Sequence, residues 1–128
     1  MQKNRFTLNK SEIISSKILI DSIHEKGYSL KLYPFFCKFL EVEKNQIPIQ
    51  FIFVVSKKRF KKAVDRNRIK RLFKEAYRLN KHNFSSKIID KNKSLAVFLS
   101  FVDNKIPTFE NMTKFVLNVF EKISNKIQ

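Results

Sequence analysis

The chain has one glycine and one cysteine among its 128 residues, and each shortage excludes a class of site. A single glycine cannot build the glycine-rich loop that holds nucleotide phosphates. A single cysteine, Cys37, cannot form an intramolecular disulfide, and its apolar neighbours predict a small buried hydrophobic side chain. This cysteine usage fits a reducing compartment.

Long apolar runs are also missing. The first residues, MQKNRFTLNKSE, lack the stretch of about 7 to 15 apolar residues found in secretory signals. No segment approaches the roughly 18 apolar residues of a membrane span. We therefore expect a cytoplasmic protein.

Residues suited to catalysis or metal binding are few and badly placed. His24, His82 and Cys37 do not show the spacing of metal ligands. The 11 acids are scattered, whereas a metal-dependent protein nuclease needs clustered carboxylates to hold its ions. We expect no catalytic residue, no metal site and no bound cofactor in this chain.

Positive charge is abundant and concentrated. Residues 57–82, KKRFKKAVDRNRIKRLFKEAYRLNKH, hold 12 of the 27 Lys and Arg residues, two of the 11 acids and five of the six Arg. This segment alone carries +10 of the formal net charge of +16. Guanidinium groups bind phosphate in bidentate fashion and stack on bases, so nucleic acid is the first partner to consider.

Two other interpretations of the charge are possible. An ordinary solvated helix face would mix charges of both signs, which this segment does not. Binding to an anionic membrane would need an exposed apolar face beside the bases. The apolar stripe of this segment can be buried against the neighbouring predicted strands. It would then not be exposed to a membrane, so nucleic acid is the favoured partner.

The spacing of apolar residues predicts a helix over 64–79. Ile69, Leu72, Phe73 and Ala76 form one stripe that would dock on a core. The bases then lie on the opposite face and its shoulders, preceded by a basic loop. Together they predict one RNA-binding surface made of Lys57, Lys58, Arg59, Lys61, Lys62, Arg66, Asn67, Arg68, Lys70, Arg71, Lys74 and Arg78.

The other elements are read from the same patterns, in a single domain over 1–128 whose residues 1–8 form an arm. The patterns predict a helix over 10–26 capped by Asn9, with Gly27 as a left-handed C-cap. A strand over 30–42 is interrupted at Pro34. Strand 49–56 is apolar on both faces and therefore predicted to be central. A polar connection follows over 80–94, then strand 95–102 beside the previous one, and a last helix that begins after Thr108.

The motif VVSKK at 54–58, followed by KKAVDRNRIKRLFKEAYR at 61–78, resembles the signature of the bacterial ribonuclease P protein component. The core of that signature is Arg66-Asn67-Arg68, with Lys70 and Arg71 following on the same helix. The resemblance extends over most of the chain, but its specific motifs lie within about residues 54–78.

The resemblance implies a fold and a function. The fold is an α+β sandwich of the ribosomal protein S5 domain 2-like type, with a mixed sheet of about four strands, three helices and a left-handed strand-helix-strand crossover around the basic helix. The function is that of the protein subunit of ribonuclease P, in which a large RNA holds catalytic Mg²⁺ and removes the 5′ leader of precursor tRNA. Both RNAs are expected partners.

The resemblance also places the leader in a cleft between the first helix and the sheet. Members of the family carry aromatic residues there, whereas this chain has Ile20, His24 and Lys38. Phe35, Phe36 and Lys38 are therefore the candidate leader-binding residues, because a strand Phe can stack on a base.

Two further function classes are weighed against this one. A structural RNA-binding protein of the ribosome or nucleoid would share the positive charge but would not be expected to carry the compact Arg-Asn-Arg motif. A stand-alone protein nuclease would need the carboxylate cluster that the sequence does not contain.

Overall fold

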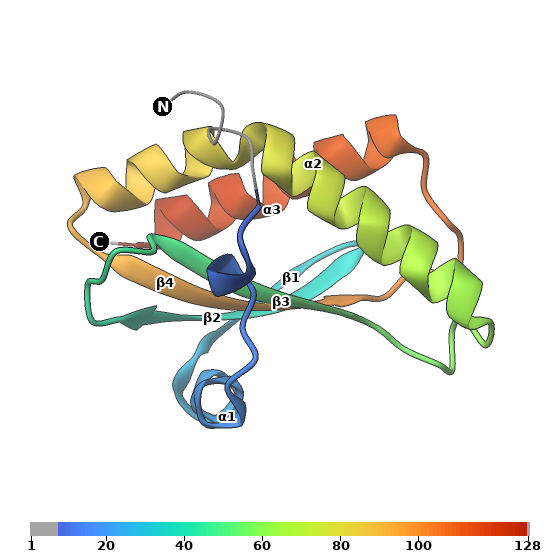
Figure 1. Ribbon diagram of the computed structural model, residues 1–128, viewed down its shortest axis with the longest axis horizontal. Helices are drawn as coiled ribbons and strands as arrows, with labels where there is room; N and C mark the ends of the chain where they lie inside the picture. Colours follow the sequence, from blue (N-terminus) through green and yellow to red (C-terminus); the bar gives the residue numbers. More distant parts are fainter. Residues whose placement is uncertain (1–7, 128) are drawn as a thin grey trace.

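The computed structural model describes residues 8–127, and the expected arm lies outside this part except for Leu8. A four-stranded sheet carries helices α2 and α3 on one face and helix α1 on the other (Figure 1). The elements in chain order are η2 Lys10–Glu12, α1 Lys17–Lys26, β1 Tyr28–Leu32, β2 Phe35–Val42, β3 Ile49–Val55, α2 Ala63–Asp90, β4 Ser94–Phe101 and α3 Phe109–Lys126. The predicted α+β architecture with three helices and four strands is confirmed.

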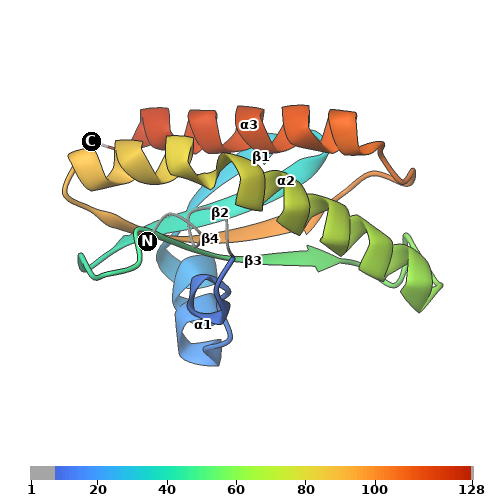
Figure 2. The same ribbon diagram turned by 45° about the horizontal axis from the view of Figure 1, so that its top comes forward.

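The strand order is β1-β2-β4-β3, with β3 parallel to β4 and the other pairs antiparallel. Helix α2 connects β3 to β4 above the sheet, and the two views in Figures 1 and 2 show this crossover to be left-handed. The prediction that β3 is a central strand was wrong. It is an edge strand, and it is apolar on both sides because Phe51 and Phe53 enter the main core while Ile52 packs with the residues beneath α1.

The free edge of β3 explains why the first helix is shorter than predicted. Instead of one helix over 10–26, the chain makes the short turn η2, in which the carboxylate of Glu12 accepts from the N–H of Asn9 at 3.0 Å. It then extends along β3, where the N–H of Ile14 donates to the carbonyl of Phe51 at 2.8 Å. Helix α1 begins only after Ser16, whose hydroxyl accepts from the N–H of Leu19.

The segment predicted as one strand over 30–42 is a hairpin. Strands β1 and β2 are joined by Tyr33 and Pro34, with Leu32 paired to Phe35. Proline has no N–H to donate, so it cannot continue a ladder and is suited to a turn. The alternation predicted for the second half is confirmed, because Phe35, Cys37 and Phe39 are buried and the residues between them are half-buried. Burial raises the pKa of the Cys37 thiol to about 12.

Helix α2 continues 11 residues beyond the predicted end at residue 79. The segment expected as a polar connection is helical over 80–90, because Phe84 and Ile88 continue the buried stripe at helical spacing. Lys81 is buried beside them, and its ammonium group pairs with the Glu12 carboxylate at 2.8 Å. This ion pair ties the N-terminal segment to α2.

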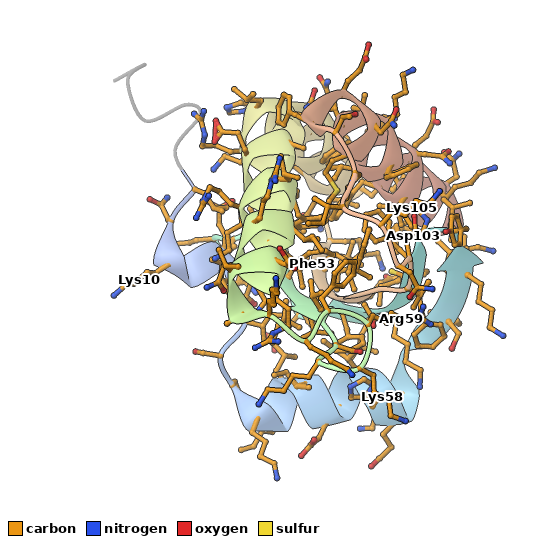
Figure 3. The ribbon with its side chains drawn as sticks, turned by 90° about the vertical axis from the view of Figure 1, so that its right-hand side faces the viewer. Lys10, Phe53, Lys58, Arg59, Asp103 and Lys105 are labelled. Atoms are coloured by element: carbon orange, nitrogen blue, oxygen red, sulfur yellow. The ribbon has the colours of Figure 1, made fainter. Side chains whose placement is uncertain are left out.

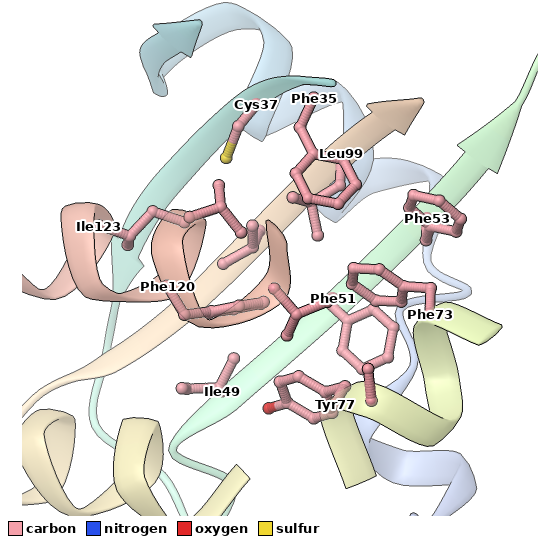
Figure 4. Close-up of a cluster of buried hydrophobic side chains, with 14 of the residues drawn as sticks. Phe35, Cys37, Ile49, Phe51, Phe53, Phe73, Tyr77, Leu99, Phe120 and Ile123 are labelled. Carbon is pink, nitrogen blue, oxygen red and sulfur yellow. The ribbon is translucent and has the colours of Figure 1, made fainter. Parts of the chain in front are cut away.

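The main core is aromatic and lies between the sheet and the helix pair (Figure 4). Phe73 of α2 is fully buried and stacks on Phe53 of β3, with ring centroids 4.2 Å apart and planes 5° apart. Phe35 of β2 meets Phe73 edge-on at 5.9 Å. On α3, the cap at Thr108 is confirmed, since its hydroxyl accepts from the N–H of Asn111 at 3.1 Å.

Gly27 ends α1 with a φ of −73°, so the predicted left-handed C-cap was wrong. The glycine is required by a close approach instead. A Cβ at this position would lie 2.4 Å from the carbonyl oxygen of Ile23 and 3.0 Å from that of Phe39, and both are backbone atoms.

We predict that Gly27→Ala destabilises the protein by about 1 to 3 kcal/mol, because the helix end must move away from β2. Ser29→Ala, an exposed change two residues further on, should alter stability by less than about 0.5 kcal/mol. Urea unfolding of the two variants measures the difference. Equal stabilities would show that the helix end adjusts without cost.

Phe73→Ala should lower the free energy of unfolding by roughly 3 to 5 kcal/mol, because it leaves a cavity against Phe53 and Phe35. The control is Val64→Ala on the same helix, where the side chain is 69% exposed. A loss below about 1 kcal/mol in chemical denaturation would contradict the assignment of Phe73 as the contact that holds α2 to the sheet.

Candidate nucleic-acid interface

The basic loop over 57–62 follows β3 and is anchored by one buried ring. Phe60 is 7% exposed and packs near Phe101, with ring centroids 6.2 Å apart. The carbonyl of Ser56 accepts from the N–H of Phe60 at 3.1 Å, and the hydroxyl of Ser56 accepts from the N–H of Arg59. Because the turn is pinned in this way, its five basic side chains are exposed around a fixed backbone; they are Lys57, Lys58, Arg59, Lys61 and Lys62.

Arg66 braces this loop from the first turns of α2. Its Nη1 donates to the carbonyl oxygens of Phe60 at 2.8 Å and Lys61 at 3.0 Å. Sequence reasoning placed Arg66 among the residues that face RNA and missed this role within the protein. Arg68 is exposed and makes no such bond to a described residue.

The outer face of α2 is a row of donors beside the N-terminal segment. A shallow hollow runs along it, lined by Leu8, Asn67, Lys70, Arg71, Lys74, Glu75 and Arg78. Glu75 is the acid in this lining, and its hydrogen bond from Arg78 holds its pKa below the usual range. The structure therefore brings five of the predicted helix residues together along this hollow: Asn67, Lys70, Arg71, Lys74 and Arg78.

A second loop supports the basic one and was not found from the sequence. After β4, the side-chain oxygen of Asn104 accepts from Nη1 of Arg59 at 3.0 Å. Next to it, the carboxylate of Asp103 accepts from the hydroxyl of Tyr33 and from the N–H of Asn104. The Tyr33 hydrogen bond lowers the pKa of Asp103 and raises that of Tyr33. Figure 3 shows Arg59, Asp103 and Lys105 grouped at this end of the sheet.

The candidate leader residues do not lie on one face. Phe35 is 1% exposed and contacts Phe73 and Phe115, so it belongs to the core and cannot stack on a base. The prediction of Phe35 as a leader-binding residue was therefore wrong. Phe36 and Lys38 are half-buried on the opposite face, toward α1. Nζ of Lys38 donates to the carbonyl of His24 at 2.9 Å and so binds a free carbonyl near the end of α1.

The part of the chain that the structure describes contains no group of three or more His, Cys, Asp or Glu side chains placed to hold a metal ion. None of the helices within 8–127 has the length and apolar character needed to cross a membrane.

A family model described as Ribonuclease P matches residues 8–124. The chain belongs to the ribonuclease P protein family. Among curated relatives, it is 28% identical over 123 residues to the ribonuclease P protein component of Porphyromonas gingivalis, covering 95% of this chain and 90% of the relative. It is 39% identical over 85 residues to that of Chlorobaculum tepidum, covering 63% of this chain and 55% of the relative.

The fold agrees with this membership. The structure of the Staphylococcus aureus RNase P protein aligns with a TM-score of 0.64 at 22% identity, covering 93% of this chain and all of that one. Membership in the ribonuclease P family gives the chain a role in tRNA processing, as part of an endoribonuclease complex.

We predict different effects for two neighbouring arginines of this ribonuclease P protein. Arg68→Ala should leave stability unchanged, weaken RNA binding and flatten the plot of log affinity against log salt by about 0.7 to 0.9. Arg66→Ala should also cost about 1 kcal/mol of stability, because two loop carbonyls lose their donor. Thermal unfolding and filter binding over a salt series measure both. Unfolding of Arg68→Ala with unchanged binding per folded molecule would contradict the surface assignment.

Proposed function

We propose that this chain is the RNA-binding protein subunit of ribonuclease P, acting with a catalytic RNA that removes the 5′ leader of precursor tRNA. The observation that carries the proposal is the continuous basic surface formed by loop 57–62 and the outer face of α2, in a chain that belongs to this family. In this proposal the protein binds and positions RNA, and the catalytic RNA cleaves the phosphodiester bond of the precursor tRNA.

Electrostatics gives the surface its proposed effect. Two RNAs that approach each other repel through their phosphates, and a basic surface between them reduces this repulsion. Each phosphate contact releases condensed counterions, so binding depends steeply on salt. Fixing the loop backbone through Phe60 and Arg66 lowers the entropy lost when the exposed side chains bind.

The donor set of the protein supports placing the metal in the RNA. Mg²⁺ takes oxygen ligands in a near-octahedral arrangement, and the acids of the described residues are not grouped to supply them. We therefore propose that catalytic Mg²⁺ is held by RNA phosphates and that this chain binds no cofactor itself. Bound Mg²⁺ would supply an activated water there.

The sheet face toward α1 is the proposed place of the leader. Phe36 and Lys38 are both on this face and offer a ring and a positive charge. The bases of a single strand can stack on such a ring without being paired. We also propose a cytoplasmic location, where tRNA precursors are made.

Leader cleavage at low Mg²⁺ tests the proposal. We expect cleavage of a precursor tRNA when the cognate catalytic RNA and this protein are both present, and little with either alone. The variant Arg68→Ala/Arg71→Ala should need more Mg²⁺ for the same rate, because two phosphate contacts are lost.

The matched control is Lys114→Ala/Lys122→Ala, which removes the same charge from exposed positions on α3. If both double variants lose activity equally, net charge rather than this surface carries binding. Binding without rescue by the unaltered protein would instead favour a structural RNA-binding role.

A further inference from the structure

An apolar hollow lies at the turn of the β1–β2 hairpin and shares no lining residue with the hollow along α2. It is lined almost wholly by carbon from Lys31, Tyr33, Phe35, Phe36 and Val102. Tyr33 is 67% exposed there, although the main core beneath it is closed by Phe35. The exposed ring therefore fills no space in the core and is accessible from the solvent.

The ring of Tyr33 is held in place. Its hydroxyl donates to the carboxylate of Asp103, and this hydrogen bond raises the pKa of Tyr33 above its usual value. Asp103 is itself fixed by the N–H of Asn104 at 2.7 Å. A ring that is already oriented loses less entropy when a flat group stacks on it.

Two basic side chains lie near the hollow. Lys31 is part of its wall, and the guanidinium of Arg59 is near enough to act on the Tyr33 hydroxyl, opposing the effect of Asp103 on its pKa. Asn104 holds Arg59 at this position with a hydrogen bond of 3.0 Å. The carboxylate of Asp103 is the acid nearby, and its charge is already engaged by Tyr33, by two backbone N–H groups and by Lys105.

We propose that this hollow binds one unpaired nucleotide of the 5′ leader, with the base stacked on Tyr33 and an adjacent phosphate held by Arg59 and Lys31. An apolar aromatic wall with a rim of cations matches a nucleotide, which has a flat base and a negative phosphate. Asn104 is then a positioning residue, because it acts through Arg59.

The leader is the part of the RNA that best fits this position. Phe36 pairs with Lys31 and lies two residues from Lys38 on the same face of β2, a distance of roughly 7 Å along the strand. The hollow thus continues the face on which the leader is proposed to lie, and a single strand has bases free to stack. The inference rests on the proposed function and adds a nucleotide position to it.

The test uses the assembled complex of protein and cognate catalytic RNA, with precursor tRNAs whose leaders are shortened one nucleotide at a time. We expect Tyr33→Ala to weaken binding of long-leader substrates by about fivefold to thirtyfold and leaderless tRNA not at all. Tyr33→Phe should retain most of the affinity, because it keeps the ring. Asn104→Ala should weaken binding less, and its effect should vanish in an Arg59→Ala background.

Tyr28→Ala is the matched control, since Tyr28 is 63% exposed at the start of β1, whereas Tyr33 follows the end of that strand. It should bind every substrate as the unaltered protein does, and thermal unfolding should show both tyrosine variants folded. Unchanged long-leader binding by Tyr33→Ala overturns the inference. So does an equal loss for leaderless tRNA or for assembly with the catalytic RNA, which would mean a contact to another RNA segment. If the unaltered protein gives no leader-dependent affinity, the leader-binding part of the proposed function fails together with the inference.

Discussion

The stacking of Phe73 on Phe53 is the contact on which the rest of this structure depends. It fixes the rotation of α2 about its own axis, because the ring must meet β3 face to face at 4.2 Å. Once that inner stripe is fixed, helical geometry places Asn67, Arg71 and Lys74 outward. The aromatic core therefore determines where the positive charge of the surface is presented.

Concentrated positive charge opposes folding, and the structure shows how the repulsion is limited. The guanidinium of Arg66 donates to two loop carbonyls, which partly offset its positive charge. Glu75 pairs with Arg78 on the outer face, and Glu12 pairs with Lys81 where α2 is buried. Bases that are not engaged within the described residues, such as Arg68, remain available to a polyanion.

The positions of the basic side chains were predicted well where they depend on local spacing and poorly where they depend on distant partners. The apolar stripe of Ile69, Phe73 and Ala76 was enough to orient the basic helix. The brace from Arg66 and the support of Arg59 by Asn104 join residues through loop geometry that no periodicity reveals. Phe35 and Phe36 are adjacent residues of the same type. Only the packing of α2 and α3 on one side of the sheet makes Phe35 a core residue.

The sequence by itself determined the basic helix over 64–79, the capping of α3 at Thr108 and the side of α2 that carries charge, because these follow from interactions within a few residues. Tertiary structure decided the rest. The segment at 13–14 pairs with the free edge of β3 rather than continuing a helix, and Gly27 is needed because two backbone carbonyls approach it. Such outcomes depend on contacts between residues far apart in the chain, and local sequence patterns do not predict these contacts.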